Sequence, residues 1–377
     1  MNGVMIFNPE HDLALANGDK NFIAPKNIRE MARDLAPLLG VMDDEQLLVW
    51  GWDVAIKGQL KHKGIAEEQL PSDSSLAALR TCSERRSAHN LLDSFRADHS
   101  DGPYVGESFI IRNVDEIAFY ANQYGHIVLK DPLSSSGKGL RHVNVYENEG
   151  GNSQRDAMSS SSLNKVKKWS DALVKRHGYL TAEPYYDKVQ DFAMEFCVCD
   201  GLCSFIGYSL FRTNQHGRYE GNLLMEDTKI ETLLSQYVPL ADLHEVQAWI
   251  IRHSDRIIPT EWDTALHPLY FGIDMMVVRS PSIIRNPQFA LHPCVEINLR
   301  LNMGIIAHEV RRKLLAPGAE GIFTVATFPT EGDALQFSKE QTKLFPILRS
   351  EGRVVSGYWP LTPVYPHTRY HAYVICE

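Results

Sequence analysis

The chain has 377 residues, 44% of them hydrophobic and 23% charged, which is the composition of a globular protein of two or three domains. Its net charge of -9 argues against a nonspecific nucleic-acid binder, because such proteins need basic surface to replace counterions. No segment approaches the roughly 18 apolar residues of a membrane-spanning helix, the N-terminus does not resemble a signal peptide, and the six cysteines have no secretory context, so we expect a cytoplasmic protein that binds no membrane.

The first fifty residues predict a strand, a helix and a second strand. Residues 4–7 and 47–50 are short apolar runs, and an amphipathic helix begins near Asn27 between them. Strands connected in this way are expected to pair in parallel, as in a βαβ unit. Ligands of such sheets bind beyond the carboxyl ends of the strands, where this chain carries polar residues that are candidates for substrate contacts: Asn8, Glu10, His11 and Asp12. The alternative is turn and cap chemistry.

The next predicted elements surround a lysine. A helix begins at Asn113, with Glu116 three residues later as in a capping box, and Gly125 ends it. The strand 126–129 leads into Lys130 and a loop with a phosphate-binding composition: Ser134, Ser135, Ser136, Gly137, Lys138 and Gly139. The loop is no Walker A motif, because Pro132 stands at the first glycine position and Gly139 follows the lysine. Phosphate binding and an ordinary mobile loop remain open.

Three cysteines, Cys197, Cys199 and Cys203, lie close together in the sequence around Asp200-Gly201. One interpretation is that the three cysteines bind a metal. The spacing of two instead favours residues on one face of a strand, and Asp-Gly is a typical hairpin turn. We therefore expect a hairpin with free thiols.

Carboxylates occur in two later apolar strands. Asp274 interrupts the run 269–278, and a buried carboxylate is costly unless it is paired or bound to metal. Glu296 and Asn298 are two residues apart in the next strand, so both point to one face, and Arg300 extends the row. Two acids and an amide oxygen suit Mg²⁺. The alternative is an ion pair with Arg300 or another arginine.

A polar run at 209–222 offers two further candidates for substrate contacts. Arg212 and Arg218 could bind an anionic group. The alternative is the exposed tip of a hairpin.

The order of these elements resembles the ATP-grasp superfamily over roughly residues 80–315. The resemblance implies that Lys130 and loop residues 134–138 contact the nucleotide phosphates. It implies that Glu183 meets the adenine amino group, with Tyr185 and Tyr186 in the hinge, and that Asp191 or Asp187 binds the ribose. It further implies magnesium at Asp274, Glu296 and Asn298, with Arg300 near the reacting oxygens. An additional cation is expected from Arg85 or Arg86.

The resemblance also implies an architecture and a function. We expect an α/β fold, α+β in the C-terminal lobe, with a small Rossmann-like domain at 1–100, a small ATP-grasp lobe at 101–182 and a large lobe at 183–377. The implied function is an ATP-dependent ligase using Mg²⁺ (or Mn²⁺), which couples a small-molecule or peptide carboxylate to an amine through an acylphosphate. Such ligases are often homodimers. An ATP-grasp kinase and a non-catalytic nucleotide-binding module are the alternatives.

Overall fold

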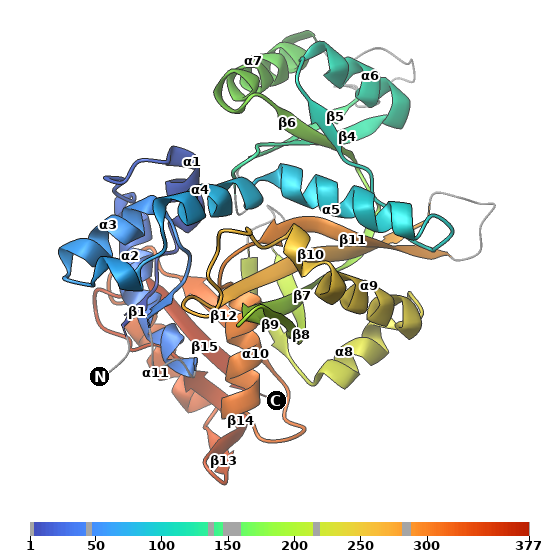
Figure 1. Ribbon diagram of the computed structural model, residues 1–377. Helices are drawn as coiled ribbons and strands as arrows, with labels where there is room; N and C mark the ends of the chain where they lie inside the picture. Colours follow the sequence, from blue (N-terminus) through green and yellow to red (C-terminus); the bar gives the residue numbers. More distant parts are fainter. Residues whose placement is uncertain are drawn as a thin grey trace.

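A computed structural model describes residues 4–42, 47–134, 139–145, 160–213, 219–280 and 288–376, and of 160–163 only the backbone. Three sheets organise these residues: a two-stranded sheet, a four-stranded sheet and a nine-stranded sheet (Figure 1). The described residues contain no helix that is both long and apolar enough to cross a membrane.

The N-terminal region contains the predicted βαβ unit. Strands β1 (Met5–Ile6) and β2 (Leu48–Val49) pair in parallel, as expected. The connecting and following helices are α1 (His11–Asn17), α2 (Lys26–Leu35), the 3-10 helix η1 (Ala36–Val41), α3 (Val54–His62), η2 (Glu67–Gln69) and α4 (Asp73–Cys82). Each sheet strand is short, so the polar residues that follow β1 lie close to those that follow β2.

The four-stranded sheet is antiparallel in the order β3-β6-β4-β5. Its elements are β3 (Phe109–Ile111), β4 (His126–Lys130), β5 (Leu140–Asn144), β6 (Leu180–Pro184) and the helices α6 (Asp115–Tyr124) and α7 (Ser160–His177). The predicted helix start is confirmed in part: the Asn113 N–H donates to Glu116 and the Asn113 side chain accepts from the Asp115 N–H, while the helix itself begins at Asp115. Strand β4 is an inner strand of this sheet and ends at Lys130.

The nine-stranded sheet has the order β11-β10-β7-β8-β9-β12-β15-β14-β13. Its strands are β7 (Lys188–Cys199), β8 (Leu202–Thr213), β9 (Tyr219–Leu224), β10 (Leu269–Arg279), β11 (Phe289–Asn298), β12 (Gly321–Thr327), β13 (Leu348–Ser350), β14 (Arg353–Pro360) and β15 (Tyr370–Cys376). Its helices are α8 (Asp227–Leu234), α9 (Leu240–Arg252), the 3-10 helix η3 (Ser254–Arg256), α10 (Met303–Leu314) and α11 (Asp333–Leu344). The expected antiparallel pairing of the Asp274 and Glu296 strands is confirmed.

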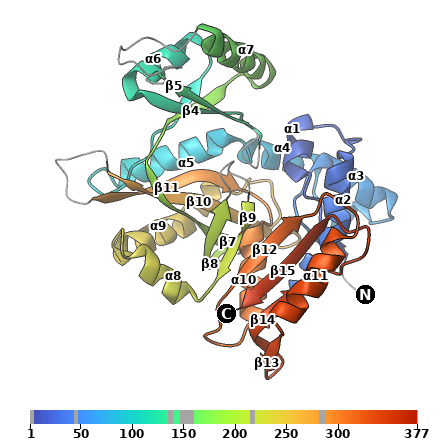
Figure 2. The same ribbon diagram turned by 180° about the vertical axis from the view of Figure 1, so that it is seen from behind.

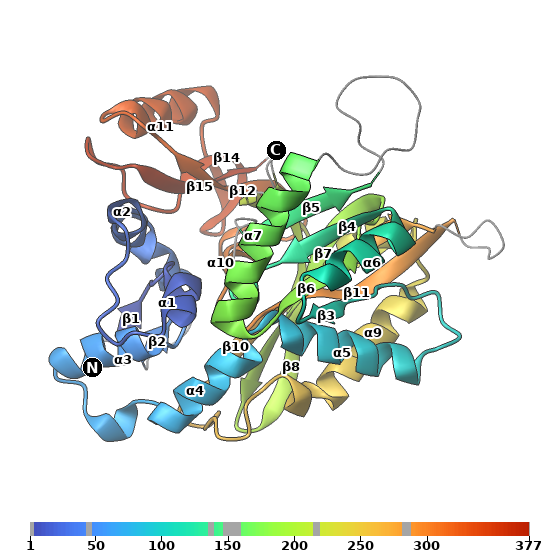
Figure 3. The same cartoon turned by 90° about the horizontal axis from the view of Figure 1, so that it is seen from above.

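The C-terminal strands pack against the N-terminal region. Leu35 and Leu38 share a buried core with Ala372 and Val374 of β15, and Figures 2 and 3 both show α2 beside these strands. Helix α5 (Arg85–Asp98) lies along β11 on the side of the small sheet (Figure 1). The chain therefore brings the N-terminal region, α5, the small sheet and the end of β11 to one place.

The cysteine-rich segment forms the predicted hairpin. Strands β7 and β8 are joined at Asp200 and Gly201, both at positive φ as a tight hairpin turn requires. Within the described ranges, Cys197, Cys199 and Cys203 form no disulfide.

Candidate functional site

The small sheet contributes a buried ion pair. Lys130 and Glu183 lie on the neighbouring antiparallel strands β4 and β6, and Nζ is 2.5 Å from Oε2. Both side chains are about nine-tenths buried, so each charge is compensated chiefly by the other. The structure thus brings together the two residues expected to meet the nucleotide, and their roles toward it remain predictions.

The two hinge tyrosines face different surroundings. Tyr185 is exposed and stacks on His126 of the small sheet, with ring centroids 4.2 Å apart. Tyr186 turns to the large sheet, where its ring meets the edge of His292 at 5.5 Å. Only Tyr186 therefore faces the space between the two sheets.

His292 is a buried polar residue that the sequence analysis did not single out. It is fully buried on β11, and both ring nitrogens lack a hydrogen-bond partner among the described residues. Burial, followed by the nearby Lys130 and Arg96 cations, lowers the pKa of His292 to about 3. The side chain is therefore neutral at physiological pH and places two polar atoms beside Lys130.

The large sheet contributes the predicted row of oxygen ligands. Asp274 on β10 lies directly opposite Glu296 on β11, and Asn298 Nδ2 donates to Asp274 Oδ1 at 3.2 Å. Burial raises the pKa of Asp274 to about 7, and the Glu296 carboxylate contributes in the same direction. Two facing, half-buried acids are unfavourable as anions unless a cation joins them.

The oxygen atoms of Asp274, Glu296 and Asn298 suit Mg²⁺ better than they suit a metal ion whose ligands all come from the protein. Within the described ranges, no three His, Cys, Asp or Glu side chains form a group that could hold a metal. Mg²⁺ characteristically takes one or two carboxylates and completes its shell with water and substrate phosphates. Asp274 and Glu296, with the amide oxygen of Asn298, match that pattern.

The geometry distinguishes Arg85 from Arg86. Arg85 Nη2 is 3.1 Å from Glu296 Oε1, and the same guanidinium donates to the Asp131 carbonyl at 3.2 Å and the Ser134 carbonyl at 3.4 Å. Arg86 instead lies over the ring of Tyr179 at 4.1 Å. Of the two arginines, Arg85 is thus the one at the acid pair, and it connects Glu296 to the loop after Lys130.

Ser134 is the only serine of the predicted phosphate loop within the described residues, and it lies in the site. The rest of the predicted loop, Ser135, Ser136, Gly137 and Lys138, lies outside the described residues.

Arg300 joins the acid row to the N-terminal region. Its Nε and Nη2 donate to the two carboxylate oxygens of Asp12 at 3.1 and 2.9 Å, and Nη2 also donates to Asn298 Oδ1 at 3.2 Å. A two-bond arginine–carboxylate contact is geometrically specific. The residues after β1 are therefore part of the same site as the predicted magnesium ligands.

A cleft lies where these elements meet. Its lining combines residues from the start of α1, the turn before α5, the loop after Lys130 and the end of β11: His11, Asp12, Leu15, Ser83, Leu133, Ser134, Glu296, Ile297, Asn298, Leu299 and Arg300. The lining is mostly polar and carries charges of both signs. Such a cleft suits a polar, charged ligand that lies next to the acid pair.

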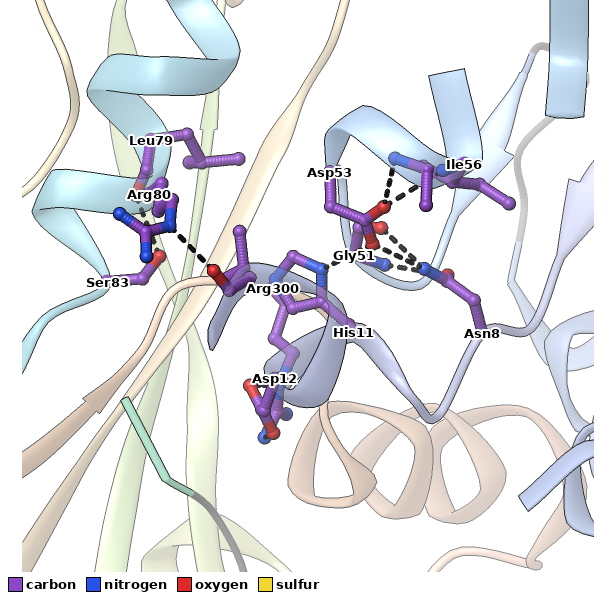
Figure 4. A network of polar contacts seen from close by, with 12 residues as sticks. Asn8, His11, Asp12, Gly51, Asp53, Ile56, Leu79, Arg80, Ser83 and Arg300 are labelled. Carbon is purple, nitrogen blue, oxygen red and sulfur yellow. Dashed lines mark hydrogen bonds and ion pairs between the residues drawn. The ribbon is translucent and has the colours of Figure 1, made fainter. Parts of the chain in front are cut away.

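A buried polar network supports the wall of the cleft at His11 (Figure 4). Asn8 clamps the backbone of Gly51, with Nδ2 donating to its carbonyl at 2.7 Å and Oδ1 accepting from its N–H at 3.2 Å. Asp53 accepts from the first N–H groups of α3 and lies 3.3 Å from His11 Nδ1. Both atoms of the Asn8 amide bond the backbone of Gly51. The side chain therefore holds the two strand ends together instead of making the predicted substrate contact. Glu10, whose Oε2 is buried, precedes α1 directly.

Gly51 lets the His11 ring approach the backbone closely, which gives a prediction. A Cβ atom at residue 51 would lie 2.3 Å from His11 Cγ. Gly51→Ala is expected to displace the ring and to lower the free energy of unfolding by about 1–3 kcal/mol, measured by urea denaturation. Gly58→Ala, within α3, is the matched control, since its Cβ would meet only an ordinary contact at 3.5 Å. Equal stability of the Gly51→Ala variant and the wild type would contradict the close packing.

The ribose candidates also differ in position. Asp187 is exposed and pairs with Arg279 Nε at 3.2 Å. Asp191 is partly buried opposite Met276 and forms an ion pair with Lys188. Burial raises the pKa of Asp191. Asp191 is thus the candidate on the side of the acid pair.

The structure does not connect the described part of the second predicted substrate segment, residues 209–222, to the cleft. Arg212 is exposed near the end of β8, and no hydrogen bond or ion pair in the described part of the chain joins it to the residues of the cleft. Arg218 lies outside the described residues. Both remain predictions.

Known structures resemble this chain over its whole length. A carboxyaminoimidazole ribonucleotide synthetase from Thermus thermophilus matches with a TM-score of 0.48 and 11% identity, over 100% of this chain and 94% of its own. A biotin carboxylase complex with β,γ-ATP from Campylobacter jejuni matches with a TM-score of 0.48 and 11% identity, over 100% and 87%. A carboxyaminoimidazole ribonucleotide synthase from Aspergillus clavatus complexed with ATP matches at 0.46 and 11%, over 99% and 93%.

At these TM-scores and identities the similarity identifies neither a family nor a function for this chain. No protein-family model and no curated protein matches the sequence. Similarity at this level concerns the fold alone and determines no subfamily. The roles of individual residues therefore depend on the geometry of this chain.

Proposed function

We propose that the protein is an ATP-dependent ligase that couples a small-molecule or peptide carboxylate to an amine. The observation that carries the proposal is the facing pair Asp274 and Glu296, with basic side chains from three separate elements around it. Arg85 contacts Glu296 directly, Arg300 contacts Asn298, and Lys130 lies at the end of β4. A site that only binds a nucleotide has less need of such an acid pair.

Phosphoryl transfer asks a protein mainly for alignment of the reactants and for charge stabilisation. Bound magnesium would neutralise charge on the transferred phosphoryl group, held by Asp274, Glu296 and Asn298. The cations of Lys130, Arg85 and Arg300 would also neutralise negative charge on this group. The substrate carboxylate would attack the terminal phosphorus of ATP, releasing ADP, and an amine would then displace phosphate from the acylphosphate.

The first test is thermal unfolding with and without Mg-ATP, for the wild type and for Glu296→Gln. A ligand at about 100 times its dissociation constant should stabilise the wild type by about 2.7 kcal/mol. We expect a magnesium-dependent rise of several degrees that is strongly reduced in Glu296→Gln and kept in the control Glu340→Gln, at an exposed position of α11. A wild type that does not respond to Mg-ATP would contradict the proposal.

The products then separate the ligase from the alternatives. With mixtures of carboxylates and amines, a ligase releases ADP and free phosphate and yields a condensed mass. A kinase yields ADP and a phosphorylated mass. Stabilisation by Mg-ATP without ADP release over the whole set would favour the binding module.

A further inference from the structure

The imidazole of His11 is held more firmly than a packing residue requires. It is 1% exposed, its Nδ1 lies 3.3 Å from Asp53 Oδ2, and its ring covers the backbone of Gly51. Asp53 in turn is fixed by two backbone N–H groups at 2.8 and 2.9 Å and by Asn8 Nδ2 at 3.4 Å. One ring nitrogen is therefore committed to a rigid carboxylate, which fixes the orientation of the other.

The other nitrogen, Nε2, is not engaged by Asp53. His11 is a lining residue of the cleft, and no described residue forms a hydrogen bond with Nε2. Figure 4 shows the ring between Asp53 on one side and Asp12 on the other, and Asp12 holds Arg300. His11 therefore lines the same small space as Arg300 and Glu296.

Charged groups lie on several sides of this ring. Asp53 and Glu10 are the acidic groups next to it, from the start of α3 and of α1, and Asp12 follows it in α1. Arg300 is the nearby cation, and Asp12 neutralises it through two hydrogen bonds. A carboxylate behind an imidazole fixes its tautomer and stabilises the imidazolium that forms when Nε2 takes up a proton.

We propose that His11 is the general base for the amine that attacks the acylphosphate, an inference that rests on the ligase function proposed above. The amine nitrogen forms a bond to the acyl carbon, the bond from that carbon to the phosphate oxygen breaks, and phosphate leaves. The proton lost by the attacking nitrogen passes to His11 Nε2. Asp53 is the positioning residue, because it acts only through the imidazole.

A purely structural role of His11 does not explain its hydrogen bond to Asp53. The cap of α3 is complete without His11, since Asp53 Oδ1 alone accepts both backbone N–H groups. The clamp of Asn8 on Gly51 is also complete without the imidazole. An apolar ring would pack against Gly51 equally well, so the hydrogen bond to Asp53 matters chiefly for a nitrogen that has to be oriented.

The first experiment reads the tautomer directly in the full chain labelled with ¹⁵N-histidine. At pH 8 we expect the proton of His11 on Nδ1 and the lone pair on Nε2, and addition of Mg-ADP with inorganic phosphate should shift the Nε2 signal. In Asp53→Asn the proton should move to Nε2, because the amide donates where the carboxylate accepted. A proton on Nε2 in the wild type, or an Nε2 signal indifferent to bound Mg-ADP and phosphate, overturns the inference.

The second experiment separates catalysis from folding. With the carboxylate–amine pair found by ADP release, His11→Asn should lower the coupling rate about 10²- to 10⁴-fold, since its amide retains a donor toward Asp53 but accepts no proton. When hydroxylamine, which is uncharged at neutral pH, replaces the amine, the coupling rate of His11→Asn should fall far less. His371→Asn is the control, a buried histidine that bonds Tyr358 and Thr362. Equal losses with both amines overturn the inference.

The two proposals fail in different ways. If Mg-ATP does not stabilise the wild type, the ligase function fails and the role of His11 falls with it. If Mg-ATP binds and coupling occurs, but the rate of His11→Asn matches that of the wild type, the ligase function stands and only the role of His11 is refuted.

Discussion

Lys130→Met is expected to lower the affinity for Mg-ATP about 10- to 100-fold and the free energy of unfolding by about 3–5 kcal/mol. The first effect follows from the loss of a charged hydrogen-bond donor to phosphate. The second follows from the ion pair with Glu183, because removal of one partner leaves the other as an uncompensated buried charge. Calorimetric titration with Mg-ATP and urea denaturation measure the two effects.

The double variant Lys130→Met/Glu183→Gln separates binding from stability. It removes both charges and keeps the volumes of the side chains, so most of the lost stability should return. If Lys130 contacts the phosphates, the double variant should bind Mg-ATP more weakly than Glu183→Gln alone, which changes only the predicted adenine contact. Wild-type affinity in both variants would show that the lysine has a structural role only.

The sequence predicts the acid row well because strand periodicity decides it. Glu296 and Asn298 are two residues apart, so they share a face whatever the rest of the chain does. The register between β10 and β11 then places Asp274 opposite Glu296. Local rules of this kind also predict the Asp200-Gly201 turn and the helix start near Asn113.

The choice between Arg85 and Arg86 could have been made from the sequence. Ala88, Leu92 and Phe95 form the buried face of α5, and Arg85 precedes Ala88 by three residues. That spacing places Arg85 on the face that packs on β11, while Arg86 is turned by about 100°. The helical spacing of the apolar residues in α5 was therefore enough to favour Arg85 over Arg86.

Contacts between distant segments could not be predicted in this way. Asp12 and Arg300 are 288 residues apart, and their pairing depends on how the N-terminal region docks against β11. The position of the C-terminal strands in the same large sheet has the same origin. Neither follows from local periodicity, because the packing of whole elements decides both.

Glu195 is a second acid within an apolar strand, which the sequence analysis overlooked, although Asp274 was recognised by the same pattern. It is fully buried in β7, where Asn302 Nδ2 donates to Oε2 at 2.7 Å. Gly272 and Gly304 make room for it, since a Cβ at either residue would lie within 2.4 Å of a carboxylate oxygen. Burial raises the pKa of Glu195 to about 8, opposed by the hydrogen bond from Asn302.

This raised pKa predicts a dependence of stability on pH. The ordinary pKa is 4.5, so between about pH 4.5 and 8 the folded protein keeps a proton on Glu195 that the unfolded chain releases. The free energy of unfolding should therefore fall as the pH rises through this range. Glu195→Gln carries no titrating group and should lack this fall, which we expect to be on the order of 3–5 kcal/mol.

Urea denaturation of the wild type and of Glu195→Gln from pH 5 to 9 measures the difference, because all other titrating groups are common to both. The amide has the size of the carboxyl and still offers an oxygen to Asn302, so the variant should gain stability relative to the wild type as the pH rises. Glu340→Gln, at an exposed position of α11, is the control and should follow the wild type. Parallel pH curves for Glu195→Gln and the wild type would mean that Glu195 is ionised in the folded protein and compensated by a group other than Asn302.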